Sequence, residues 1–232
     1  ALNALANFAS LFSDVFPRFL KDQSTFKATA LGHPFLRTDM RVCNDFALNQ
    51  NKSVVLITGS NMSGKSTFLR TIGINMALAY AGAPVIAEEM ELSVFRLFCC
   101  IQVNDSITAG VSQFYAEVKR LKELKQALET WENVLFLVDE IFKGTNNRER
   151  FIGSRSYIRF LLGASGLGAI STHDLELTHL ADESPRIRNN HFREFVENGQ
   201  LVFDYKLRTG PCPTTNALKI MRLEGLPVES ET

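Results

Sequence analysis

The chain has no excess of charge of either sign, and it has no long apolar run. Lysine and arginine together number 25, and aspartate and glutamate together also number 25. A balanced charge gives no global attraction for nucleic acid, so we expect any DNA contact to use a local patch or regions outside this chain. The absence of a run of about 18 apolar residues predicts no membrane contact from this segment.

Cysteine is scarce, and its spacing excludes two further classes of protein. The four cysteines, Cys43, Cys99, Cys100 and Cys212, match neither a metal-binding pattern nor a disulfide framework. Reduced thiols of this kind favour a cytoplasmic location. A chain of 232 residues can bury a core without such staples. It begins at Ala1 rather than at a methionine, so we expect a segment of a longer protein.

The most specific motif is a glycine-rich loop that fits G-x-x-x-x-G-K-[ST]. The apolar run over 53–58 predicts a buried strand before it, and helical spacing over 65–80 predicts a helix after it. In this context, backbone N–H groups and the helix N-terminus cradle the phosphates of a nucleoside triphosphate. The loop residues expected to contact the nucleotide are Gly59, Ser60, Asn61, Met62, Ser63, Gly64, Lys65, Ser66 and Thr67.

Four side chains carry the chemistry that such a loop requires. Lys65 adds positive charge, and Ser66 can ligate Mg²⁺. Asp139 and Glu140 end the apolar strand expected at 134–138, where ligands bind in open α/β sheets. We expect Asp139 to hold the magnesium ion and Glu140 to orient or activate the attacking water. Alone, an Asp-Glu pair is more often a surface feature, and the loop upstream favours the catalytic interpretation.

Two further polar residues are candidates because of where they lie along the chain. His173 follows a strand expected at 168–171, where an imidazole can hydrogen-bond a γ-phosphate, although a lone histidine is usually structural. Ser112 precedes a helix expected at 113–130 and can stabilise it as an N-cap by ~1 kcal/mol. A capped helix N-terminus also binds anions, so both interpretations of Ser112 stay open.

The alternation of strands and helices predicts an α/β fold with a mostly parallel sheet and helices on both faces. The remaining expected elements are an amphipathic helix over 2–20, a short strand at 84–87, an extended run over 97–103, helices at 147–163 and 174–181, a β-hairpin over 190–207 turning at Asn198-Gly199, and a helix at 214–224.

Five ordered motifs are shared with one known family. They read TGSNMSGKST (58–67), DSITAGVSQFYAE (105–117), DEIFKGT (139–145), STHDLELT (171–178) and GPCPTTNALKIMRLEGLP (210–227). In this order they resemble the ATPase domain of the MutS family of DNA mismatch repair proteins, within the ABC ATPase class. The resemblance implies a P-loop NTPase fold of ABC type for residues 31–232, with a β-hairpin and a C-terminal helix. Residues 1–30 would end a preceding helical, lever-like region.

The resemblance also implies an ATP-gated homodimer with composite sites. Such ATPases hydrolyse ATP with Mg²⁺ and pair head to tail, so that each nucleotide lies between two subunits. One subunit would contribute Lys65, Ser66, Asp139, Glu140 and His173, while Ser112 would reach the γ-phosphate of the nucleotide held by the partner. ATP would then close the dimer, and hydrolysis would loosen it.

The chain departs from the family pattern at several positions. Ser60 and Ser63 replace a proline and a glycine of the loop. Arg41 stands where the family often stacks a phenylalanine on adenine, and it can still stack by a cation–π contact. Tyr205 matches a position where the family can place an aromatic ring against the base.

Three alternative functions are to be weighed against this one. A transport or chromosome-maintenance ABC ATPase is disfavoured because the chain lacks an L-S-G-G-Q signature. An ATP-gated interaction module with little turnover is disfavoured by the intact set of Lys65, Asp139 and Glu140, but the changes at Ser60 and Ser63 keep it open. A MutS relative acting on DNA structures other than mismatches also remains open, because nothing in this chain resembles the mismatch-reading domain.

Overall fold

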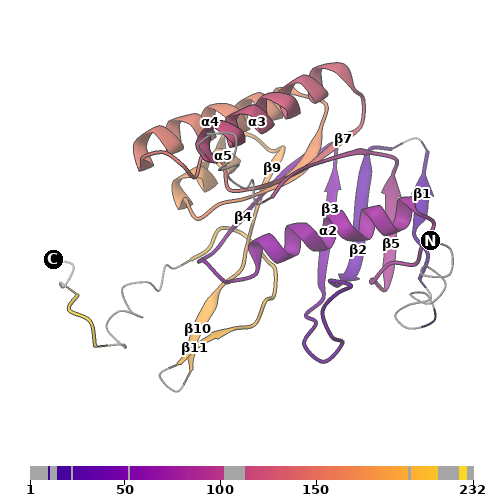
Figure 1. The fold of residues 1–232 in the computed structure, drawn as a ribbon, viewed down its shortest axis with the longest axis horizontal. Coiled ribbons are helices and arrows are strands. Elements are labelled where there is room, and N and C mark those ends of the chain that lie inside the picture. The colour runs from indigo at the N-terminus through magenta and orange to yellow at the C-terminus, as the bar shows by residue number, and fades with distance from the viewer. Residues whose placement is uncertain are drawn as a thin grey trace.

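The computed structural model of the chain describes residues 10, 15–21, 23–51, 53–101, 113–197, 200–213 and 225–228. These residues form a mixed α/β fold with two main sheets and helices on both faces of the larger sheet (Figure 1). The expected α/β class is therefore confirmed. The predicted helix at 214–224 and the turn at 198–199 lie outside the described residues.

The larger sheet has six strands in the order β12-β9-β4-β8-β7-β6. Four of its five pairings are parallel, and only β12 runs antiparallel to its neighbour. Its central strands β4, β7 and β8 are buried on both faces and read as continuous apolar runs, which is why the sequence showed them clearly. Their bounds are β4 Val54–Thr58, β6 Arg96–Cys100, β7 Val134–Asp139, β8 Leu167–Ser171, β9 Ile187–His191 and β12 Arg208–Thr209.

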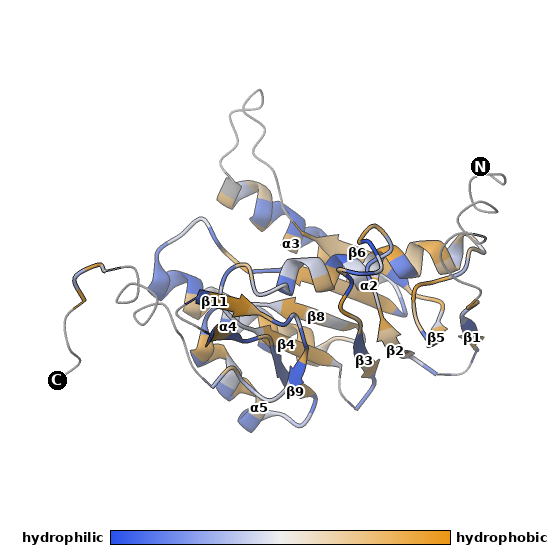
Figure 2. Cartoon of the chain, turned by 90° about the horizontal axis from the view of Figure 1, so that it is seen from below, coloured by the Kyte–Doolittle hydropathy of each residue, from blue (hydrophilic) through white to orange (hydrophobic). Residues whose placement is uncertain are grey.

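Helices cover both faces of this sheet. On one face, α2 (Lys65–Tyr80) packs between the larger sheet and the smaller one, and all three share a single hydrophobic core. On the other face, α3 (Gln113–Thr130), α4 (Asn147–Gly163) and α5 (Leu180–Glu183) pack around a second core. Figure 2 shows β4 and β8 as largely hydrophobic strands in the middle of the molecule. The predicted helices at 65–80, 113–130 and 147–163 are confirmed.

The smaller sheet corrects part of the sequence interpretation. Its order is β1-β5-β2-β3, with β1 Arg18–Leu20, β2 Thr25–Leu31, β3 Asn44–Asn49 and β5 Glu89–Ser93. Residues 18–20 are therefore strand, so the helix predicted over 2–20 is wrong at its end. Residues 25–30 are also strand, not part of a helical region. The strand predicted at 84–87 is wrong as well, because the extended segment is β5, two residues later.

A hairpin projects from the larger sheet near the C-terminal end of the chain (Figure 1). Its strands are β10 Glu194–Glu197 and β11 Gln200–Phe203, paired antiparallel. The hairpin predicted over 190–207 is therefore shorter than expected, because residues 187–191 belong to the main sheet. A 3₁₀ helix (Leu175–His179) and α5 together replace the helix predicted at 174–181.

None of the helices in the described ranges is long and apolar enough to cross a membrane.

Gly168 in β8 allows a close approach that a side chain would block. A Cβ built at Gly168 would lie 2.2 Å from the Phe136 ring and 2.3 Å from the Phe136 carbonyl oxygen. Phe136 itself is completely buried in β7. A strand glycine of this kind leaves room for the close approach of the neighbouring strand, here of Phe136.

We predict that Gly168→Ala lowers the free energy of unfolding by roughly 1–3 kcal/mol or more, because the overpacked core must shift. Urea denaturation measures this change. The matched control is Gly163→Ala, where an added Cβ meets no described atom within 4 Å. Equal stability of the two variants would contradict the prediction.

Candidate active site

The candidate site lies at the carboxyl ends of three parallel strands. β8 pairs with β4 on one side and with β7 on the other, and Ile57, Ser171 and Asp139 share one row of this pairing. The chain leaves each strand just beyond that row, so the glycine loop, Glu140 and His173 emerge at one edge. Ligands of open α/β sheets bind at such an edge.

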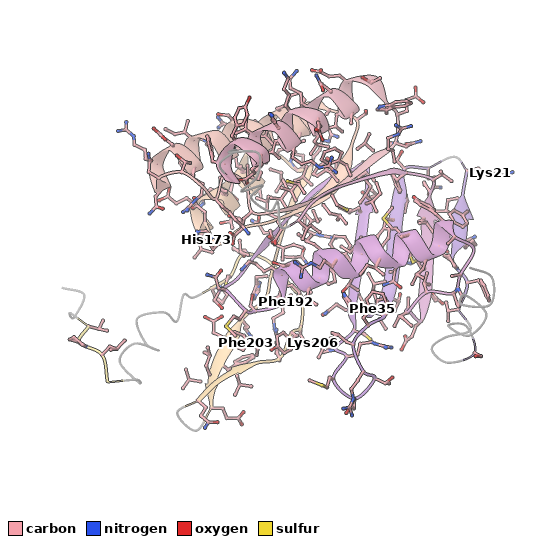
Figure 3. The ribbon with its side chains drawn as sticks, in the orientation of Figure 1. Lys21, Phe35, His173, Phe192, Phe203 and Lys206 are labelled. Carbon is pink, nitrogen blue, oxygen red and sulfur yellow. The ribbon has the colours of Figure 1, made fainter. Side chains whose placement is uncertain are left out.

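The glycine loop adopts backbone conformations that few side chains tolerate. Gly59 and Gly64 have φ values of 144° and 106°, and Met62 has a φ of 67°. A Cβ at Gly59 would lie only 2.6 Å from the carbonyl oxygen of Phe192. Figure 3 shows Phe192 beneath the start of α2, beside this loop. The loop is thus shaped by close backbone packing against β9 and its following residues.

Lys65 begins α2, and its ammonium lies inside the glycine loop. The residue is 5% exposed, and its Nζ donates to the carbonyl oxygens of Gly59 and Ser60, each at 2.7 Å. Burial lowers the pKa of Lys65, while the carboxylates of Glu140 and Asp139 act in the opposite direction. The site therefore holds a buried cation close to two anions.

The first turn of α2 is open to an anion. Gly64 is the N-cap, no side chain among the described residues caps the helix, and the first turn contains no acidic residue. The unpaired N–H groups and the helix dipole both favour negative charge here. Because Lys65 and the loop amides lie at the same point, the whole arrangement can hold phosphate groups.

Asp139 ends β7 in a buried, hydrogen-bonded position. It is 6% exposed, and its Oδ1 accepts a hydrogen bond of 2.5 Å from the Ser171 hydroxyl. The Lys143 ammonium lies 4.0 Å from Asp139 Oδ2. In the part of the chain that the structure describes, no three His, Cys, Asp or Glu side chains cluster as a metal site. A magnesium ion would therefore need Asp139, the Ser66 hydroxyl and oxygens of a ligand, which is the usual arrangement for Mg²⁺ with phosphates.

Glu140 lies between two basic side chains. Its Oε1 is 3.1 Å from His173 Nδ1, and its Oε2 is 3.4 Å from Lys143 Nζ. Burial raises the pKa of Glu140, but the hydrogen bond to His173 and the charges of Lys143, His173 and Lys65 outweigh it and hold that pKa at about 2. The carboxylate is therefore ionised at neutral pH and can accept a hydrogen bond from water.

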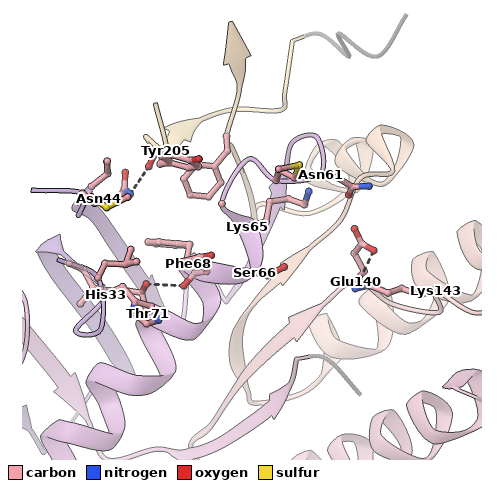
Figure 4. A pocket seen from close by; sticks show the side chains of 18 residues that line it. His33, Asn44, Asn61, Lys65, Ser66, Phe68, Thr71, Glu140, Lys143 and Tyr205 are labelled. Carbon is pink, nitrogen blue, oxygen red and sulfur yellow. Dashed lines mark hydrogen bonds and ion pairs between the residues drawn. The ribbon is translucent and has the colours of Figure 1, made fainter. Parts of the chain in front are cut away.

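The loop and the carboxylate face one another across a cavity of about 590 Å³. This volume is in the range of small-molecule sites. Figure 4 shows Lys65, Ser66 and Asn61 opposite Glu140 and Lys143, with Tyr205, Asn44 and His33 at the other end. The apolar and aromatic side chains that line the cavity are Leu31, Leu36, Met40, Val42, Met62, Phe68, Phe192 and Tyr205.

The aromatic end of the cavity is held by Asn44. Its Nδ2 donates to the Tyr205 carbonyl at 3.0 Å, and its Oδ1 accepts from the Leu207 backbone at 2.7 Å. The Tyr205 ring lies 3.1 Å from a Cβ built at Gly64, so it packs directly over the end of the glycine loop. Burial, with the charges of neighbouring arginines, lowers the pKa of His33, which is neutral at pH 7.

Arg41, expected at the base, is not among the described side chains that line the cavity. Its guanidinium donates to the Leu36 carbonyl at 2.7 Å instead, and its neighbours Met40 and Val42 line the cavity. The expected stacking of Arg41 on a base stays a prediction, and in this structure its two neighbours line the cavity instead.

The two serine departures lie apart from the cavity. Ser60 donates from its hydroxyl to Glu194 Oε2 at 2.8 Å, which ties the glycine loop to the hairpin. Ser63 is 1% exposed, and its hydroxyl lacks a hydrogen-bond partner within the described part of the chain. Neither side chain obstructs the cavity.

Ser112 lies outside the described residues, so its predicted role stays a prediction. Sequence reasoning missed Lys143, Asn44 and Ser171, although each contacts a predicted site residue. Lys143 lies inside the shared segment 139–145, which was the available signal. The contacts of Asn44 and Ser171 depend on strand pairing, which no local pattern reveals.

Comparison with known proteins assigns the class. A family model described as MutS domain V matches residues 55–230. The chain therefore belongs to the MutS family, and the matched part corresponds to domain V of that family.

Individual relatives agree with this assignment. The chain is 34% identical to DNA mismatch repair protein MutS of Geobacillus kaustophilus over 239 residues, which covers 97% of this chain and 26% of that protein. It is 33% identical to the protein of the same name from Lysinibacillus sphaericus, covering 98% of this chain and 27% of that protein. The chain thus spans about a quarter of the length of these relatives.

We predict that His173→Ala raises the pKa of Glu140 from about 2 toward its ordinary value of 4.5, because a hydrogen bond to the carboxylate is lost. A depressed carboxyl pKa stabilises the fold above about pH 4.5, and this contribution disappears as the pH falls toward 2. A ¹³C carboxyl NMR titration measures the midpoint. The control is His179→Ala, which changes an exposed histidine paired with Asp182. An unchanged midpoint in His173→Ala would contradict the assigned cause.

Proposed function

We propose that this domain binds ATP with Mg²⁺ and hydrolyses it to ADP and phosphate, as the nucleotide-gated part of a MutS-like DNA mismatch repair protein. The observation that carries the proposal is the opposition, across one cavity, of the Lys65 loop and the ionised Glu140. A buried cation with open backbone N–H groups suits phosphates, and a fixed carboxylate suits an attacking water.

Four side chains act at the phosphate end of the cavity. Lys65 exchanges its two loop carbonyls for phosphate oxygens, and the uncapped first turn of α2 adds N–H donors. Asp139 and Ser66 would hold Mg²⁺, which neutralises the charge on the transferred phosphoryl group. The hydroxyl of Ser171 keeps the Asp139 carboxylate oriented.

Glu140 orients the attacking water, and its two basic neighbours hold its carboxylate in place. His173 and Lys143 hold the carboxylate from opposite sides, at 3.1 and 3.4 Å. A carboxylate with a pKa of about 2 is a weak base, so its main contribution is to align the water and stabilise its developing positive charge. Lys143 also supplies positive charge close to where the γ-phosphate would lie.

Adenine would occupy the aromatic end of the cavity. Tyr205 offers a ring face beside Gly64, and Phe68, Met40 and Val42 supply apolar surface. His33 Nδ1 accepts from the Phe35 amide, so the Nε2–H of the neutral imidazole can donate a hydrogen bond at this end. Tyr205 therefore takes the base-contacting role that the resemblance suggested for it.

We extend the proposal to a P-loop NTPase fold of ABC type and to an ATP-dependent, head-to-tail homodimer. Met40 and Met62 line the cavity, yet 68% and 83% of their surfaces are exposed, and Phe35 is 78% exposed nearby in sequence. Exposed apolar residues around a ligand cavity favour a covering partner. DNA contact through regions outside this chain is in line with the names of the relatives, and a cytoplasmic location completes the proposal.

We predict that Lys65→Ala abolishes tight ATP binding, because a buried charge that faces the phosphates is lost. Glu140→Gln should leave binding intact and reduce turnover by about 100-fold or more, because the water is no longer aligned. Isothermal titration and a phosphate-release assay measure the two effects. Lys125→Ala, at an exposed position on α3, is the matched control for the lysine change.

Retained affinity in Lys65→Ala would overturn the phosphate site. ATP binding by the native chain without any turnover would instead favour a nucleotide-gated interaction module.

We predict that specific ATPase activity rises with protein concentration, because each site needs a second copy. Ser112→Ala should reduce activity at every concentration if Ser112 acts on the nucleotide of the partner. Steady-state hydrolysis with Mg²⁺, combined with sizing in the presence of ATP, measures both. Activity independent of concentration and of Ser112 would indicate a self-contained site.

A further inference from the structure

Glu117 is a buried carboxylate that lines no part of the nucleotide cavity among the described residues. It lies on α3, is 5% exposed, and accepts hydrogen bonds from two backbone N–H groups. The Phe142 amide donates to its Oε1 at 2.5 Å, and the Lys143 amide donates to its Oε2 at 3.1 Å. Burying a carboxylate is costly unless it is hydrogen-bonded, so these two contacts account for its tolerance in this position.

The segment that Glu117 holds is the loop over residues 140–144, directly after β7. Glu140 and Phe142 have φ values of 59° and 60°, a region that residues other than glycine seldom adopt. Each such residue costs of order 1 kcal/mol or more and persists only when its surroundings impose it. At the start of the loop, the amide of Glu140 donates to the Ser171 carbonyl at 3.1 Å. The loop is therefore held at one end by β8 and at the other by Glu117.

Side-chain packing joins the same loop to α3. A Cβ built at Gly144 would lie 2.7 Å from the Phe114 Cβ and 3.1 Å from its Cα, so the loop touches the first turn of α3. The Phe114 and Phe142 rings lie 6.2 Å apart between their centroids. A Cβ at Gly153 of α4 would lie 2.9 Å from the Phe142 ring. The loop thus fits closely between two helices.

We propose that Glu117 is a positioning residue for the ATP hydrolysis proposed above. By accepting the Phe142 and Lys143 amides, it holds the 140–144 loop in the strained shape that presents Glu140 and Lys143 to the cavity. The inference rests on the proposed function and goes beyond it, because Glu117 acts only through the loop. It also means that a displacement of α3 moves the catalytic carboxylate.

The test compares Glu117→Gln with Glu123→Gln in the chain as it stands. Both changes replace a glutamate of α3, but the Glu123 side chain is 56% exposed and paired with Arg120. Glu117→Gln keeps the shape of the side chain, but the NH₂ group of glutamine cannot accept a hydrogen bond. One of the two backbone amides therefore loses its acceptor. The Glu123 variant should behave as the native chain does.

For Glu117→Gln we expect kcat to fall about 10- to 100-fold while the Kd for ATP changes by no more than about twofold, because only the transition-state alignment is lost. Hydrogen exchange of the Phe142 and Lys143 amides should become faster in this variant alone. A purely structural role would instead lower the unfolding midpoint and weaken ATP binding together with turnover.

A second variant, Gly144→Ala, tests the same contact between the 140–144 loop and α3 without changing the Glu117 carboxylate. Its Cβ collides with Phe114 and displaces the loop from α3. We expect the same loss of kcat with preserved ATP affinity, whereas Gly163→Ala, which meets no described atom within 4 Å, should have no effect.

The outcomes separate this inference from the proposed function. If the native chain hydrolyses ATP and Glu117→Gln has the same kcat, the positioning role is overturned. Parallel losses of kcat and ATP affinity in Glu117→Gln would overturn it as well. If the native chain showed no ATPase activity, the proposed function would fail. The amide exchange would still decide the inference: unchanged protection of Phe142 and Lys143 in Glu117→Gln would overturn it, and faster exchange would support the loop-holding contact.

Discussion

The site depends on one row of strand pairing, in which Ser171 of β8 lies between Ile57 of β4 and Asp139 of β7. The Ser171 hydroxyl donates to the Asp139 carboxylate, and the Ser171 carbonyl accepts from the Glu140 amide. A single residue therefore aligns both carboxylates relative to the glycine loop that follows Thr58. A shift of this register by one residue would move every side chain to the other face of the sheet.

Charge complementarity is the second constraint on the site. Lys65 is buried, and the carboxylates of Asp139 and Glu140 offset part of the cost of burying its charge. Lys143 and His173 in turn hold Glu140 ionised. Removal of one partner from such a group leaves a buried charge unpaired. The loss of any one member therefore costs more free energy than its own contact contributes. A bound triphosphate would enter a region in which basic and acidic side chains already lie next to one another.

Much of the fold followed from local patterns, and the failures have identifiable causes. The fully buried strands β4, β7 and β8 and the three long helices have continuous or helical apolar spacing, so they were predicted correctly. In the smaller sheet, β1 was missed because it is three residues long and lies at an edge, where little apolar burial marks a strand. Strands β2 and β3 mix buried residues with more exposed ones, so no continuous apolar run marks them.

The sequence by itself determined the glycine loop, the residues at the strand ends and the family, because these depend on residue type and spacing along the chain. Only the tertiary structure decided which groups meet: Lys143 and His173 around Glu140, Asn44 behind Tyr205, and Glu117 beneath the loop at 140–144. The physical reason is that these contacts, apart from the pair of Lys143 and Glu140, join segments separated by long stretches of chain. Their distances depend on strand register and helix packing, which local residue preferences do not encode.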